Sequence, residues 1–295
     1  MDILIIVWIV YGVISVLLML CFIVVFGANK RFDNSFYRVV QCDQIMNLCC
    51  YLNSWIHRLA QRPQTGYLLQ NFPPIIFTIT AYTTFFFFQT QSASIILLCF
   101  YRYSLLKFEN ANKFWKKWCI LVYFGVILLY SIVLMLPIFA AFHPLVYDGA
   151  VGFFVDAPEF AEYRYTYGAY LWFCCVTYFI IIITLGLRTV FELRKRFAQH
   201  QNDSRTRDVL MRITIIVAIN TVVYMLIIWW MLTIGIFVPD IDRVLQNELV
   251  MTVSDTLSFS MPYTLLLCDK KVQEMISQKI PIFYRNPSSV VAPIS

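Results

Sequence analysis

Charged side chains are scarce in this chain: Asp, Glu, Lys and Arg make up 14% of its residues, against about 25% in an ordinary soluble domain. Hydrophobic residues account for 60% and aromatic residues for 17%, a balance that argues against a soluble enzyme. Most of the apolar residues lie in long runs. A run of about 18 or more residues nearly free of charge is long enough to cross a bilayer as a helix, so the chain is predicted to be an integral membrane protein.

Seven apolar runs predict seven membrane-spanning helices, joined into a single domain over residues 1–295. The runs cover residues 3–26, 36–56, 75–101, 118–142, 165–187, 213–238 and 249–267, and residues 268–295 form a tail. Asp43 interrupts the second run and Asp255 the seventh, whereas the other five contain no acidic or basic residue. The expected fold class is therefore an all-α integral membrane protein with a seven-transmembrane helix bundle.

Basic residues are distributed unevenly between the two sides of the predicted bundle. Nineteen of the 23 Lys and Arg residues follow odd-numbered spans or lie in the tail, counting Arg38 at the start of the second span. Because Lys and Arg accumulate in cytoplasmic loops, we expect the N-terminus outside and the C-terminus inside. The positive charge then lies at the inner surface, next to membrane lipid, and gives no support to nucleic-acid binding.

Residue types that some membrane enzymes and pigments require are missing or badly placed. The three histidines are His57, His143 and His200, and the predicted topology puts His200 on the opposite side of the membrane from the other two, which argues against a zinc hydrolase. Residues 248–267 contain no lysine for a retinal Schiff base. The nine cysteines lie within or at the inner edge of predicted spans and indicate no disulfide framework. We therefore expect no enzyme, no metal and no cofactor.

The third predicted span ends in Tyr101-Arg102. Arg102 resembles the arginine of the Asp-Arg-Tyr motif of rhodopsin-like receptors, with Tyr101 in place of the acid, and both are candidates for contact with a G protein. Gln91, Phe88 and Thr84 share a helical stripe with Arg102, which predicts that they face the bundle interior and line a ligand pocket. The alternatives are packing between helices for these three and a simple orienting charge for Arg102.

Aromatic residues are prominent toward the predicted outer side. Trp229 in the sixth span reaches the outer half of the membrane, as a pocket residue or as an interface anchor. The second outer loop, residues 143–164, is rich in Phe and Tyr and contains no cysteine. This loop is therefore predicted either to cover the pocket as a lid or to form part of an aromatic belt.

The two acids within the predicted spans are candidates for an intramembrane polar network, because ionisable groups are costly there. A helical rise of about 1.5 Å per residue places Asp43 closer to the inner surface than Asp255. Asn47 follows Asp43 by one turn on the same face and reaches nearly the depth of Asp255. We therefore expect Asn47 to contact Asp255, with Asp43 nearer the cytoplasmic side.

The predicted inner side has three further features. Pro262 loosens the hydrogen-bond ladder of the seventh span and predicts a helix bend. After this span, Val272, Met275, Ile276 and Ile280 share one face, which predicts a short interfacial helix. The third inner loop, residues 188–212, is basic, and orientation by charge alone would account for it. Its candidates for contact with a G protein are Arg194, Lys195 and Arg196.

Three parts of the sequence resemble the nematode serpentine receptors of class gamma, the Srg family, and their relatives. They are residues 35–48 with 51–55, Lys113-Phe114-Trp115, and Met261-Pro262-Tyr263 with Asp269. The resemblance implies a G-protein-coupled chemoreceptor of the plasma membrane, with a small-molecule ligand and a heterotrimeric G protein as partners. The alternative is a heptahelical transporter or ligand-gated channel, since two intramembrane acids suit a proton path, but the chain lacks repeated halves.

Overall fold

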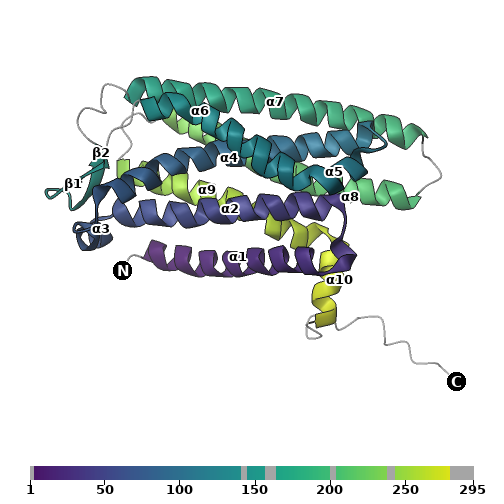
Figure 1. The fold of residues 1–295 in the computed structure, drawn as a ribbon, viewed down its shortest axis with the longest axis horizontal. Helices are drawn as coiled ribbons and strands as arrows, with labels where there is room; N and C mark the ends of the chain where they lie inside the picture. The colour runs from purple at the N-terminus through teal and green to yellow at the C-terminus, as the bar shows by residue number, and fades with distance from the viewer. Residues whose placement is uncertain (1–2, 141–144, 157–163, 200–203, 238–242, 280–295) are drawn as a thin grey trace.

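The computed structural model describes residues 3–140, 145–156, 164–199, 204–237 and 243–279, and most of these residues are helical (Figure 1). The long elements are α1 (Ile3–Ala28), α2 (Ser35–Ala60), α4 (Pro74–Lys107), α5 (Ala111–Leu121), α6 (Leu128–Ala140), α7 (Arg164–Gln199), α8 (Ser204–Phe237) and α9 (Arg243–Cys268). The short elements are η1 (Lys30–Phe32), α3 (Pro63–Leu69), η2 (Val122–Ile127), β1 (Leu145–Asp148), β2 (Phe153–Asp156) and α10 (Lys270–Lys279).

The long helices run along the longest dimension of the molecule, with α10 turned away from them at one end and the β1–β2 hairpin at the other (Figure 1). We call these the α10 end and the hairpin end. Helix α4 contacts α2, α6, α7 and α8, while α2 also contacts α1, α5 and α9. The interior of the bundle is therefore built around α4 and α2.

Within the described residues, four helical stretches are long and apolar enough to cross a membrane: Ile6–Ala28, Pro74–Lys107, Ala111–Phe139 and Gly168–Phe197. Helix α8 contains a shorter apolar stretch, Thr214–Trp230. Helix α2 is more polar, because it buries Asp43, Gln44 and Asn47 among its apolar residues. These polar groups face other helices rather than the outside of the bundle, as helices in a membrane require.

The helices extend beyond several of the predicted spans, and two of the differences are large. The fourth predicted span is longer, because α5, η2 and α6 follow one another without a break from Ala111. The prediction of a long inner loop over residues 188–212 is wrong, because α7 continues to Gln199 and α8 begins at Ser204. Hydropathy ends a span at the first charges, whereas Arg, Lys and Glu are good helix formers and let the helix continue beyond the apolar region.

Helix α10 confirms that a short helix follows the last predicted span. Val272 and Met275 are buried on one side of it, where they join the main hydrophobic cluster. The hydroxyl of Tyr37 in α2 donates to Oδ2 of Asp269, just before α10, at 2.7 Å. The helix is therefore held against the start of α2; Ile280, predicted on the same face, lies outside the described residues.

Strands β1 and β2 form an antiparallel hairpin against the hairpin end of α4. Gly152 in its turn has a φ of 76°, which favours glycine. The amide of Leu145 donates to Oγ1 of Thr78 at 2.9 Å, and the buried ring of Phe154 lies 4.4 Å from that of Phe77, centroid to centroid. The described part of the predicted outer loop thus packs on the bundle.

No disulfide holds this hairpin, because all nine cysteines are free. Phe154→Ala is expected to release it, since truncating a buried phenylalanine costs about 3–5 kcal/mol. In this variant, hydrogen exchange of the β1 and β2 amides should become much faster. The control is Val146→Ala at an exposed position of β1, which should exchange near the wild-type rate. Unchanged protection in Phe154→Ala would show that the Phe77 contact does not hold the hairpin.

Candidate functional site

A cavity of about 100 Å³ lies between α4, α7, α8 and α9. Thr84, Phe88 and Gln91, the three residues of the predicted stripe, line it from α4. Mostly apolar walls with a few polar groups are typical of small-molecule sites. The other lining residues are Phe85, Leu171, Cys175, Tyr224, Ile227, Val253, Ser254 and Leu257.

Trp229 lies elsewhere, and its predicted place in the pocket is corrected. Its side chain is 63% exposed, whereas Ile227, two residues earlier on α8, lines the cavity. Residues two apart on a helix point about 200° apart, so these two cannot face the same side. The apolar residues of the sixth predicted span follow no helical period, and the available signal for its rotation was Asn220, a buried polar residue two turns before Ile227.

Gln91 joins the cavity to a buried polar network. Its Nε2 donates to Oδ1 of Asn47 in α2 at 2.9 Å and to Oγ of Ser258 in α9 at 2.8 Å. Asn47 in turn donates from Nδ2 to Oδ2 of Asp43 at 3.1 Å. One amide in the cavity wall thus connects three helices.

Asp43 extends this network toward the α10 end. It accepts a hydrogen bond from the hydroxyl of Ser94 in α4, and the Ser94 hydroxyl also lies 2.6 Å from that of Tyr123. All three side chains are buried. Tyr123 belongs to η2, a π-helical turn of the kind often found at functional sites. We call Gln91, Asn47, Asp43, Ser94 and Tyr123 the polar chain.

Asp255 has a different partner from the one predicted. Instead of contacting Asn47, its Oδ2 lies 2.8 Å from Nη2 of Arg58, and both side chains are buried. Arg58 was placed outside the second predicted span, but α2 continues to Ala60, and the long arginine side chain brings its charge into the bundle. The sequence estimate of depth used the position of each residue along its helix. It could not reveal this pair, because the long arginine side chain puts the charge far from the backbone of Arg58.

Aromatic rings surround the arginine of this ion pair. The guanidinium carbon of Arg58 lies 4.6 Å from the ring centroid of Trp8 and 5.4 Å from that of Trp55. Arg62 also lies over Trp8, at 5.0 Å. Cation–π contacts of this kind gain strength where water is excluded. The cluster therefore ties α1, α2 and α9 together near the hairpin end.

At the α10 end, Tyr101 and Arg102 turn inward from α4. The hydroxyl of Tyr101 lies 2.9 Å from Oγ of Ser35 at the start of α2. Nε of Arg102 donates to Oγ1 of Thr214 in α8 at 3.1 Å, and the Arg102 side chain is largely buried. Arg102 thus links α4 to α8, two helices that also line the cavity.

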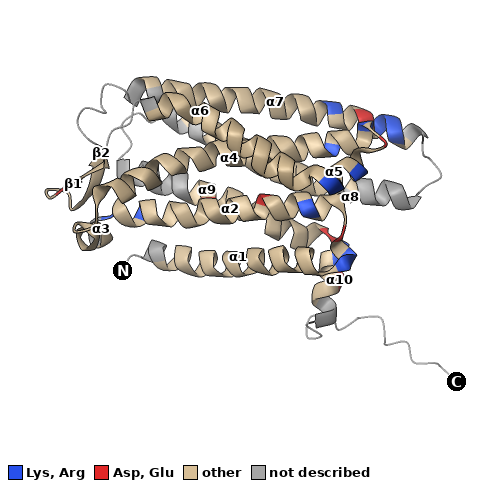
Figure 2. Ribbon diagram, viewed as in Figure 1, with Lys and Arg blue, Asp and Glu red and all other residues tan. Residues whose placement is uncertain are grey.

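Basic residues gather at the α10 end of the bundle (Figure 2). Asp33 accepts from Arg38 at 2.9 Å and from Lys116 at 2.8 Å, and these two cations lower the pKa of its carboxyl below the ordinary value. The part of α7 that was predicted as a loop has three basic side chains near the end of the helix, and each of them is exposed or half-buried. They are Arg194, Lys195 and Arg196.

Two tyrosines that sequence reasoning missed bind α4 through their hydroxyls. Tyr224 of α8 donates to Oγ of Ser92 at 2.6 Å, and Tyr178 of α7 donates to Oε1 of Gln89. In the sequence, each tyrosine is marked only by its hydroxyl within an apolar run, and this does not reveal which group the hydroxyl bonds to. Pro262 lies inside α9, which continues on both sides, and the predicted bend there stays a prediction.

The fold and the site together define a class. Long apolar helices around a mostly apolar cavity, with interior acids held in polar networks, are the architecture of a multi-pass membrane protein. Among the described residues, no group of three or more His, Cys, Asp and Glu side chains is placed to hold a metal ion.

The sequence matches the family model of the Srg family chemoreceptors over residues 5–276. It is 34% identical to serpentine receptor class gamma-53 of Caenorhabditis elegans, over 95% of this chain and 93% of that protein. It is 26% identical to serpentine receptor class gamma-47 of the same organism, over 91% of this chain and 88% of that protein. The chain therefore belongs to the Srg chemoreceptor family and is a serpentine receptor of the plasma membrane.

Proposed function

We propose that this protein is a G-protein-coupled chemosensory receptor with seven membrane-spanning helices. The spans are α1, α2, α4, the continuous rod of α5, η2 and α6, and then α7, α8 and α9. The gathering of Lys and Arg at the α10 end (Figure 2) supports a cytoplasmic position for this end, because basic residues are retained on the cytoplasmic side. Helix α10 then lies at the inner membrane surface.

The ligand site in this proposal is the cavity between α4, α7, α8 and α9. Its volume of about 100 Å³ suits a compound of few heavy atoms, since an apolar cavity of about 150 Å³ in another protein binds benzene. Gln91 and Ser254 offer hydrogen bonds within otherwise apolar walls. We therefore infer a small, mainly apolar ligand with one polar group.

The observation that supports signalling most strongly is the double role of Gln91, which lines the cavity and also bonds to α2 and α9. A ligand that bonds to this amide competes with Asn47 or Ser258 for it. The ligand then favours one arrangement of the polar chain over another, which is a population shift between two states of the bundle. At the cytoplasmic end, Arg102 and the basic residues of α7 contact the G protein.

A calcium response in cells that express the receptor tests this proposal. Cells are exposed to a panel of small volatile and soluble compounds, and wild type is compared with Arg102→Ala at equal surface expression. We expect an active compound to lose its response in Arg102→Ala, because the variant lacks the guanidinium that joins α4 to α8 and is proposed to meet the G protein.

Thr214→Val separates the two roles of this arginine. The variant keeps Arg102 but removes its acceptor on α8, so basal signalling should rise while the response to the compound remains. A full response in Arg102→Ala would contradict the proposed coupling. If the compounds evoke currents or uptake in cells without a G protein, the protein is a transporter or channel and the proposed receptor function is wrong.

A further inference from the structure

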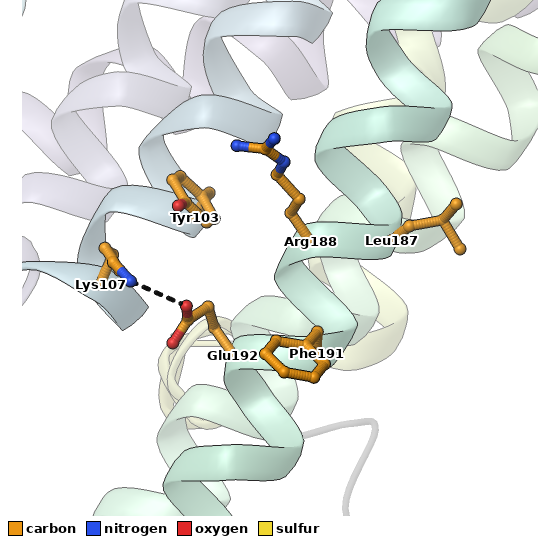
Figure 3. Close-up of a pocket in the computed structure, with 6 residues that line it drawn as sticks. All are labelled: Tyr103, Lys107, Leu187, Arg188, Phe191 and Glu192. Carbon is orange, nitrogen blue, oxygen red and sulfur yellow. Dashed lines mark hydrogen bonds and ion pairs between the residues drawn. The ribbon is translucent and has the colours of Figure 1, made fainter.

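A second cleft, separate from the ligand cavity, opens between α4 and α7 at the α10 end. Its volume is about 430 Å³, within the range of small-molecule sites. Figure 3 shows Arg188 reaching from α7 into the space between the two helices, on the side where Tyr103 of α4 lies. The remaining lining residues are Lys107, Leu187, Phe191 and Glu192.

The charge of this cleft is positive. Nζ of Lys107 lies 3.1 Å from Oε1 of Glu192 (Figure 3), so these two charges offset each other. Arg188 is exposed, and among the described residues no carboxylate lies within ion-pair distance of it. Its guanidinium therefore has free N–H donors in a planar fork, the geometry that binds phosphate through two hydrogen bonds.

The apolar residues of the cleft indicate the rest of the ligand. Leu187 and Phe191, which flank Arg188 on α7, are 68% and 69% exposed. Exposed large apolar side chains next to exposed Lys and Arg are typical of the boundary between the hydrocarbon of a membrane and its polar surface. A soluble anion would leave this apolar surface uncovered, whereas the acyl chains of a lipid would cover it.

We propose that this cleft binds an anionic glycerophospholipid of the cytoplasmic leaflet, with the phosphate on Arg188 and the acyl chains along Leu187 and Phe191. Basic sites between helices at the cytoplasmic surface suit anionic head groups. The assignment to this leaflet rests on the orientation in the proposed function. The site joins α4 to α7, which also contact each other along the bundle, so the lipid would bridge two of the helices that line the ligand cavity.

Native mass spectrometry of the full receptor, released from nanodiscs of phosphatidylcholine and phosphatidylserine, tests the lipid site. Wild type should retain phosphatidylserine in preference to phosphatidylcholine. Arg188→Gln should lower this retention about tenfold, the loss expected when a hydrogen bond between charged groups is removed from the site. Lys113→Gln is the matched control, because it removes a basic charge from exposed Lys113 of α5 outside the cleft, and it should retain phosphatidylserine as wild type does.

Three outcomes would overturn the lipid assignment. The first is equal retention of the two lipids by wild type, and the second is equal loss in Arg188→Gln and Lys113→Gln. The third is displacement of the lipid by soluble glycerophosphoserine at matched concentration, because the cleft would then select a free phosphate ester. The lipid measurement uses neither a chemosensory compound nor a G protein. If the lipid assignment fails, the calcium response is therefore still a separate test of receptor function.

Discussion

Arg58→Met is expected to destabilise the folded receptor by about 3–5 kcal/mol, because it leaves Asp255 as a buried charge without its partner. The pair spans 2.8 Å between Nη2 and Oδ2, and its side chains are only 3% and 6% exposed. The double variant Arg58→Met/Asp255→Leu should recover most of the loss, since apolar side chains often replace a buried ion pair at no net cost. A thiol-reactive dye measures the unfolding, because six of the nine cysteines are buried.

The same substitution in an exposed pair provides the control. Arg31 of η1 pairs with Glu274 of α10, and their side chains are 37% and 56% exposed. Arg31→Met should therefore change stability by less than about 1 kcal/mol. Wild-type stability in Arg58→Met, or a double variant no more stable than the single one, would show that this buried pair does not hold α2 to α9.

Gln91→Leu is expected to raise the ligand concentration for a half-maximal calcium response by about 5–150-fold, the range that 1–3 kcal/mol of coupling covers. The substitution removes the amide that the cavity offers to a ligand and both hydrogen bonds from this amide to Asn47 and Ser258. Asn47 then keeps a buried acceptor without its donor, which disfavours the arrangement of the polar chain seen in the structure.

Two further variants locate the origin of this effect. Gln89→Leu removes an equally buried amide from α4, one that bonds to Tyr178 and does not line the cavity, so ligand sensitivity should change little. Asn47→Leu leaves the cavity wall intact but removes a competitor of the ligand for the Gln91 amide, so the ligand concentration for a half-maximal response should fall rather than rise. Equal shifts in Gln91→Leu and Gln89→Leu would mean that amide loss on α4, and not the cavity, causes the effect.

Several local features follow from the sequence because a repeating pattern encodes them. Helical spacing back from Arg102 predicted that Thr84, Phe88 and Gln91 share one face of α4, and the structure places all three in the wall of one cavity. Apolar spacing after the seventh span predicted the helix α10. In both cases the pattern lies within one helix, so no knowledge of neighbouring helices was needed.

Partners between helices could not be predicted in this way. Asp255 was singled out as an acid within a span, and its side chain is buried, but its ion pair with Arg58 depends on the relative shift of α2 and α9 and on the reach of the arginine side chain. The rotation of α8 was also missed, because its apolar residues follow no helical period and only the polar Asn220, which is buried, marks the inner face. Trp229 is therefore exposed while Tyr224 and Ile227 line the cavity.

Composition and charge distribution by themselves thus determine that this chain is a helical membrane protein and where the apolar parts of its helices lie, because hydrocarbon requires long apolar helices with internally satisfied backbones. Only the tertiary structure decides which polar groups meet. The link from Gln91 through Asn47 to Asp43, and the contact of Arg102 with Thr214, arise from the rotation and relative shift of packed helices. These depend on the side chains of every neighbour at once, and no single segment encodes them.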